Sequence, residues 1–293
     1  MGTSKTSTGP GKNVPLVPNW VGPDSPTPNL GAPPLTSPGD GSPRPPRNPP
    51  EKKPDGPLAE KPDQQQQMAS ARRFTPARRA MGNFTKTGDS RSLRSALGNY
   101  VRGGYGGSDT ATRRMGRSTS VAGGVFDVLS RGGGDAAAEP PPLDVRTLAG
   151  LSADEIAERI AEAINPGDIS LDDAGVREAV AEAVSSVLTE NDTADIADLP
   201  TELIEACYVR TLSISAFNIL IADIGASLQR AAHGNASLAN DRMKEVSDFV
   251  REAYSAQYAK FKGSGGQITR QTATSIARDI TAQVMDIFES YLE

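Results

Sequence analysis

Most of the chain's prolines lie near its start: residues 1–68 hold 17 of the 23. Proline lacks a backbone N–H and fixes φ, so such a stretch favours extended, polyproline-like conformations over helix or strand. The same residues show no hydrophobic periodicity and end near a run of four glutamines at 64–67. We therefore predict that residues 1–68 form a disordered arm and that the hydrophobic core is built from the remaining residues.

The two halves of the chain carry opposite charge. Residues 1–140 contain 19 Lys/Arg and 11 Asp/Glu, a balance of +8, whereas residues 141–293 contain 12 and 25, a balance of −13. Such an asymmetry indicates two regions with different partners, or a region that seeks an acidic surface.

Residues 143–293 have apolar side chains at helical spacing, with no alternating strand pattern. Ser152 and Glu155 form a capping-box pattern, and isoleucines follow at every fourth position. Residues 200–232 are apolar on all sides, which is typical of a buried central helix. We expect an all-α helical bundle with its own core. Its predicted helices span 152–164, 171–189, 200–232, 237–262 and a last segment after the loop at 263–266.

Residues 69–130 form a basic segment that precedes this bundle. Between residues 72 and 117 there are eleven Lys/Arg and only two Asp/Glu. Glycines and prolines then dominate residues 131–142, which we predict to be a linker. The sequence thus predicts an arm, a short basic helical segment, a linker and a C-terminal helical domain.

Turn and capping signals divide the basic segment into helical fragments. Asp89 or Ser90 is expected to cap a first helix. The glycines at 103–107 are expected to end it, because glycine costs roughly 1 kcal/mol per helix position. Ser108 or Asp109 would cap the next helix, which runs toward the apolar residues that follow.

Six arginines of the basic segment are spaced to touch the phosphates of a nucleic acid, and nearby aromatic rings could stack on bases. Alternatively, the same surface binds an acidic protein or the acidic half of this chain, and protein contact is favoured. No helix-turn-helix or zinc-finger pattern supports reading of a base sequence. The candidate contacts are Arg72, Arg73, Arg78, Arg79, Arg113 and Arg114, and the aromatic residues are Phe74, Phe84, Tyr100 and Tyr105.

The sequence offers little for catalysis. One cysteine, Cys207, and one histidine, His233, cannot assemble a zinc site of the Cys/His kind within one chain. The glycine cluster at 103–107 lacks the Gly-Lys-Ser/Thr ending of a phosphate-binding loop. We predict no cofactor, no metal and no enzymatic activity. With no secretory signal and no span expected, we predict a cytoplasmic protein without a membrane partner.

The N-terminus carries the most specific chemical feature. Gly2 follows the initiator Met1 and is small enough to allow its removal, which would leave a free glycine amine. Gly2 with Thr6 also fits the N-myristoylation pattern, and an unmodified terminus is the default. A short apolar island with the chain's one tryptophan lies nearby. It either docks on a partner or covers a patch of its own domain; its residues are Pro15, Leu16, Val17, Pro18 and Trp20.

Short motifs in two blocks resemble the QatB proteins of the bacterial Qat anti-phage defence system. The first block has MGTS at 1–4, GPG at 9–11 and VPLVPNW at 14–20. The second has RRF at 72–74, LGNYV at 97–101, GGYGG at 103–107 and ATRRM at 111–115.

This resemblance implies a set of partners. The Qat system pairs this component with a QatA-like ATPase, a QatC-like enzyme of the QueC family and a TatD-like nuclease. QueC-like enzymes act on 7-deazaguanine with ATP, and in defence systems such an enzyme is expected to join a deazaguanine to the N-terminal glycine of a partner. Gly2 corresponds to that acceptor, and the island around Trp20 becomes a candidate docking element.

Three hypotheses of function follow. The first is a non-catalytic component of an anti-phage complex, which binds the ATPase and presents Gly2 for modification. The second is an accessory protein that binds nucleic acid through the basic segment, and the third is a host-directed effector whose arm is a targeting signal.

Overall fold

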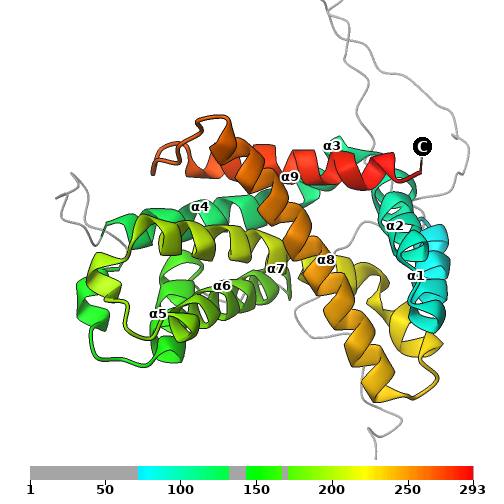
Figure 1. The fold of residues 1–293 in the computed structure, drawn as a ribbon, viewed down its shortest axis with the longest axis horizontal. Helices are drawn as coiled ribbons and strands as arrows, with labels where there is room; N and C mark the ends of the chain where they lie inside the picture. Colours follow the sequence, from blue (N-terminus) through cyan, green and yellow to red (C-terminus); the bar gives the residue numbers. More distant parts are fainter. Residues whose placement is uncertain (1–71, 132–142, 167–170, 293) are drawn as a thin grey trace, which may run out of the picture. The chain divides into compact units, whose positions relative to one another are not determined.

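The computed structural model describes residues 72–131, 143–166 and 171–292. Within these ranges the chain forms nine α-helices, with short 3-10 and π turns and no β-strand, which confirms the predicted all-α class (Figure 1). The predicted arm at 1–68, with Gly2 and the island around Trp20, lies outside the described residues, as does most of the predicted linker.

The helices of the C-terminal part match their sequence signals closely. Ser152 Oγ accepts the backbone N–H of Glu155 at 3.3 Å, and the Glu155 carboxylate accepts the N–H of Ser152 at 2.9 Å, which confirms the capping box. The last helix follows the loop at 263–266 as predicted, after a turn held by hydrogen bonds between Thr269 and Thr272. The helices are α5 (Ala153–Ile164), α6 (Leu171–Glu190), α7 (Thr201–Ala231), α8 (Ala236–Gly263) and α9 (Ala273–Ser290).

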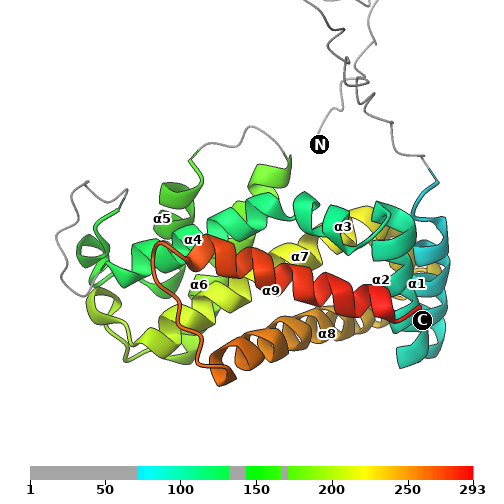
Figure 2. The same ribbon diagram turned by 90° about the horizontal axis from the view of Figure 1, so that it is seen from above.

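Helix α7 is the central element of the core. The consecutive residues Cys207, Tyr208 and Val209 are all buried, so this helix is covered on several sides at once. Its length and mean hydropathy of 1.5 would suit a membrane span, but more than half of the apolar window is buried inside the protein. Helices α6 and α8 pack on it together with two helices from the basic segment (Figure 2).

The basic segment supplies four helices to the same core. They are α1 (Thr75–Thr87), α2 (Ser90–Asn99), α3 (Ser108–Arg114) and α4 (Gly116–Ser130). Helices α1 and α4 pack against α7, and α3 and α4 pack against α9 (Figure 2). The described residues on both sides of the predicted linker contribute to one hydrophobic core, from Phe74 in the basic segment to Phe288 in α9.

The glycine cluster at 103–107 ends the helical run as predicted, with Gly106 in the left-handed region at φ 80°, but a π-helical turn comes first. Asp89 caps α2 as predicted, accepting the N–H groups of Arg91 at 3.2 Å and Ser92 at 3.0 Å. However, α2 passes into a π-helix, Tyr100–Tyr105, which includes the first glycines of the cluster. Gly104 is needed there because a Cβ atom at this position would overlap the Phe74 ring.

The predicted side-chain cap of α3 is wrong. Neither Ser108 nor Asp109 caps the helix; instead the Ser108 N–H donates to the Glu289 carboxylate of α9 at 2.8 Å. The cap therefore comes from a residue 181 positions away in the sequence. A carboxylate at a helix N-terminus also interacts favourably with the helix dipole.

A half-buried acid on α7, Asp223, holds the basic segment in place. The Asp223 carboxylate accepts the hydroxyl of Tyr100 at 3.0 Å and that of Tyr105 at 2.6 Å. Its main-chain carbonyl accepts the Arg78 guanidinium at 2.7 and 3.2 Å. The Phe74 ring stacks on Tyr100 and meets Tyr105 edge-on, with both centroid distances 5.4 Å. This Asp223 cluster ties α1 and the π-helix to α7.

Close approach of α4 and α9 gives a first prediction. A Cβ at Gly123 would overlap the Thr274 side chain and lie 3.1 Å from its Cα, so Gly123→Ala should lower the free energy of unfolding by about 1–3 kcal/mol. Gly116→Ala, on the same helix with open space around it, should be neutral or up to about 1 kcal/mol stabilising. Urea denaturation measures both, and equal effects would contradict this packing.

The Asp223 cluster gives a second prediction. Burial, followed by the hydrogen bond to Asp223, raises the pKa of Tyr105 to about 12. The folded protein therefore holds this phenol proton more tightly than the unfolded chain, whose tyrosine pKa is about 10. The contribution of Tyr105 to stability is complete below about pH 10 and is lost as pH rises through the folded pKa.

We expect Tyr105→Phe to lower the free energy of unfolding by roughly 1–2 kcal/mol at neutral pH. The difference from the unsubstituted protein should shrink between about pH 9 and pH 12. Urea denaturation across this range measures the difference in free energy of unfolding. A difference that stays constant would show that ionisation of the Tyr105 hydroxyl does not affect stability.

Candidate functional site

The six predicted contact arginines differ in their burial and in the groups they contact. Arg73 is half-buried, with its guanidinium 4.6 Å from the Phe74 ring centroid and 5.2 Å from that of Tyr105. Arg78 points inward to the Asp223 carbonyl. Arg72, Arg79, Arg113 and Arg114 are exposed, the last two on α3.

The predicted stacking role of the aromatic residues is wrong for most of them. Phe74, Phe84 and Tyr100 are each at most 5% exposed, so their faces are not available to a base. Tyr105 is half-buried, and its hydroxyl is bound to Asp223. Sequence alone did not show this, because the spacing of aromatics among arginines does not reveal which side of each helix meets α7.

Two of the arginines line a basic groove with residues that the sequence did not single out. Arg78 and Arg79 of α1 lie along it with Lys86, and the other wall contributes Arg230 and His233 from the end of α7. Lys86 belongs to the same basic stretch of sequence and could have been included. Arg230 and His233 could not, since nothing local connects them to α1.

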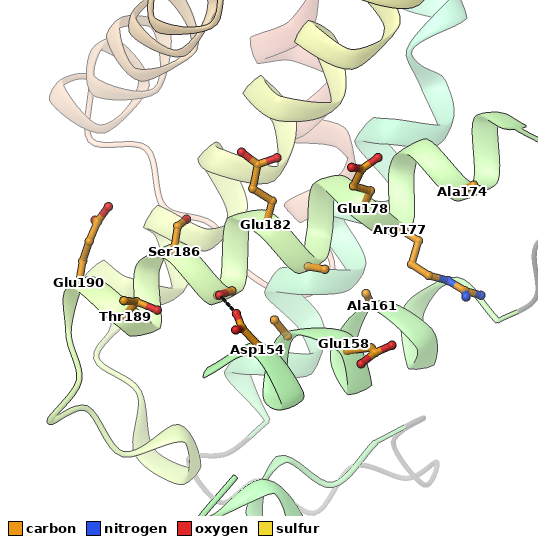
Figure 3. Close-up of a pocket in the computed structure, with 13 residues that line it drawn as sticks. Asp154, Glu158, Ala161, Ala174, Arg177, Glu178, Glu182, Ser186, Thr189 and Glu190 are labelled. Atoms are coloured by element: carbon orange, nitrogen blue, oxygen red, sulfur yellow. Dashed lines mark hydrogen bonds between the residues drawn. The ribbon is translucent and has the colours of Figure 1, made fainter. Parts of the chain in front are cut away.

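A second groove, of about 840 Å³, lies between α5 and α6 (Figure 3). Its floor includes small side chains, with Ala157 and Ala161 from α5 and Ala174 and Ala181 from α6. Ala157 and Ala161 are buried, whereas Ala174 is exposed and Ala181 half-buried, so only the α6 side of this lining is open to another chain. No local sequence pattern indicates this groove, because it depends on how α5 and α6 pack together.

Carboxylates dominate the edges of this α5–α6 groove. Asp154 and Glu158 project from α5, and Glu178 and Glu182 project in parallel from α6 (Figure 3). Among the described residues, Glu158, Glu178 and Glu182 have no ion-pair partner. Negative charges that are not compensated nearby attract a cationic ligand.

Other polar side chains of the lining are held by hydrogen bonds within the protein. Glu190 forms a bidentate pair with Arg210, with both N–O distances 2.9 Å, and this pair lowers the pKa of the Glu190 carboxyl. Asp154 accepts a hydrogen bond from Ser185. Arg177 is the one cation among the lining residues, and it donates to the Asn165 carbonyl at 3.1 Å.

The residues that could carry catalysis are not brought together. Cys207 is fully buried, and burial raises its pKa to about 12, which keeps it protonated at neutral pH. His233 lies on the surface at the end of α7. Over residues 72–131, 143–166 and 171–292, no cluster of His, Cys, Asp or Glu could hold a metal ion.

Comparison with known proteins supports the resemblance seen in the sequence. A family model described as "Qat anti-phage system associated protein QatB" matches residues 106–288. No curated protein and no solved structure matches the chain. The matched region is well over half of the chain and covers α3 to α9, so it includes the helical domain for which the short motifs provided no evidence. The chain therefore belongs to the QatB family of proteins associated with the Qat anti-phage system.

Proposed function

We propose that this protein is a non-catalytic component of the Qat system that docks on the system's ATPase and presents Gly2 to its QueC-like enzyme. Membership of the QatB family places the chain in anti-phage defence. The rest of the proposal combines the partners implied by that family with the α5–α6 groove, whose unpaired carboxylates are the observation that carries it.

The α5–α6 groove suits a helical partner segment. Its lining on α6 extends from Ala174 to Glu190, which corresponds to about 24 Å of helix, or between four and five turns. A floor of alanines accepts the backbone of an incoming helix at short distance, and recognition of a helix in a groove is a common mode of protein association.

Charge determines which kind of helix fits. Of the five carboxylates that line the groove, Glu190 is neutralised by Arg210, and Arg177 is the one cation in the lining, so the occupant should be rich in lysine and arginine. We assign this occupant to a basic helix of the ATPase. Complementary charge of this kind accelerates encounter and disfavours wrong partners.

The arm has a separate task in this proposal. Removal of Met1 frees the amine of Gly2, and the proline-rich sequence of residues 1–68 can extend that amine away from the helical unit. The QueC-like enzyme would join a deazaguanine to it. The TatD-like nuclease is a further expected member of the assembly, which we place in the cytoplasm.

Charge reversal tests the docking step. Glu178→Lys with Glu182→Lys should weaken binding to the ATPase by at least about tenfold, because like charges would then face each other. Glu252→Lys with Asp286→Lys makes the same change in net charge at exposed positions on α8 and α9, and it should leave binding intact. Calorimetry with the purified ATPase measures both. Equal loss in the two variants, or none, would rule out this groove as the docking site.

Mass spectrometry tests the presentation of Gly2. Protein expressed from its own operon should carry an added mass on the N-terminal glycine, and this mass should disappear when the QueC-like gene is deleted. Deletion of residues 14–21 should also prevent the modification, because it removes the island around Trp20.

The two results separate the parts of the proposal. An unmodified Gly2 under all conditions would remove the presentation mechanism and leave a docking component. Modification that persists without residues 14–21 would retain the acceptor role of Gly2 and exclude the island as the docking element.

A further inference from the structure

The basic groove between α1 and the end of α7 is opposite in charge to the α5–α6 groove. Its volume is about 490 Å³. The cationic or ionisable groups along it are Arg78, Arg79, Lys86, Arg230 and His233, and no carboxylate is among its lining residues. The positive charge of this surface is therefore locally uncompensated, in a protein whose net charge is −5.

Two of the guanidinium groups are already held in position. Arg78 is fixed by its two hydrogen bonds to the Asp223 carbonyl, and Arg230 donates from Nε to the Ala226 carbonyl at 3.0 Å. Side chains that are ordered before a ligand arrives lose less conformational entropy when they bind it.

The remaining cations have no acidic partner among the described residues. Arg79 and Lys86 are exposed and take part in no ion pair there. Some other cations of the fold are paired, as Arg210 is with Glu190, Arg242 with Glu245 and Lys262 with Glu205. The groove thus brings together cations of which Arg79 and Lys86 have no ion-pair partner among the described residues.

Helix dipoles explain only part of this arrangement. Lys86 and Arg230 lie in the last turns of α1 and α7, where a positive charge is favourable. Arg79 lies in the second turn of α1, beyond the first and last turns where the dipole acts. The helix dipole therefore gives no reason for a positive charge at position 79.

The rest of the lining distinguishes between classes of ligand. It consists of Thr75, Ser227 and Ala231, with no large aliphatic or aromatic side chain. A protein interface needs such anchors at its centre, and a small-molecule pocket is usually enclosed and mostly apolar. Cations and hydroxyls without apolar anchors match phosphate groups instead.

The groove is also long enough for a polymer. From Thr75 to Lys86 the α1 wall extends about 16 Å. At about 3.4 Å per phosphate along one strand, this length corresponds to four or five phosphates of a nucleic acid backbone. We propose that the α1–α7 groove binds the phosphate backbone of a nucleic acid without reading its base sequence.

The proposal is tested by fluorescence anisotropy with a labelled single-stranded oligonucleotide of mixed sequence and the full-length protein. Binding should occur at low salt and weaken as salt is raised. Arg79→Glu with Lys86→Glu should weaken it by about tenfold or more and should make its dependence on salt shallower. Circular dichroism and urea denaturation of each variant establish that it remains folded.

A matched control uses cations outside the groove. Lys244→Glu with Arg278→Glu makes the same change in net charge at exposed sites on α8 and α9 and should leave oligonucleotide binding unchanged. Equal weakening by both pairs of substitutions, or no salt-dependent binding by the unsubstituted protein, would overturn the proposal.

Competition distinguishes nucleic acid from an acidic protein. Poly-glutamate should displace the oligonucleotide poorly at equal charge concentration, because the lining of guanidinium, ammonium and hydroxyl groups is matched to phosphates spaced along a strand. Displacement as effective as that by unlabelled oligonucleotide would identify a site for an acidic protein and reject ours. The substitutions at Glu178 and Glu182 should not affect this assay, so its outcome is independent of ATPase docking.

Discussion

The architecture depends on the need to cover α7 on several sides. Its buried side chains include Leu212, Leu220, Ile224 and Leu228, each at most 2% exposed, and full burial of such a residue contributes about 1.5–3 kcal/mol. One neighbouring layer cannot cover a helix of this kind. Helices α6 and α8 cover part of it, and α1 and α4 complete the cover. The basic segment is therefore a structural part of the helical core, and its positive charge is displayed from a fixed surface.

Asp223 shows how this packing accommodates a charge. An acid on an apolar helix would be costly without partners, and here it receives hydroxyl groups from Tyr100 and Tyr105. Burial and this hydrogen bonding hold the pKa of Tyr100 well above its ordinary value, so both hydroxyls remain donors at neutral pH. The same cluster orients Arg78 along the basic groove. A contact that stabilises the fold thus also prepares a binding surface.

The protein has two grooves whose lining residues carry opposite charge. The α5–α6 groove combines carboxylates with a floor of alanines and suits a cationic helix, whereas the α1–α7 groove combines cations with hydroxyls and suits phosphates. They are formed by different pairs of helices, so both can be occupied without competing for the same side chains.

The sequence by itself determined the helices whose signals are local. The capping box at Ser152 and the apolar character of α7 were sufficient to place them, and the predicted ends of α6, α7 and α8 agree with the structure to within about two residues. It did not identify α1 as a separate helix, although Pro76 in its first turn is a local start signal.

Only the tertiary structure decided that Glu289 caps α3 and that Gly104 lies in a π-helix against Phe74. It also decided which residues line each of the two grooves. Capping boxes and hydrophobic periodicity act over a few residues, so they can be read along the chain. Grooves and long-range caps depend on which helix faces meet, and that is decided by burial of apolar surface among residues far apart in sequence.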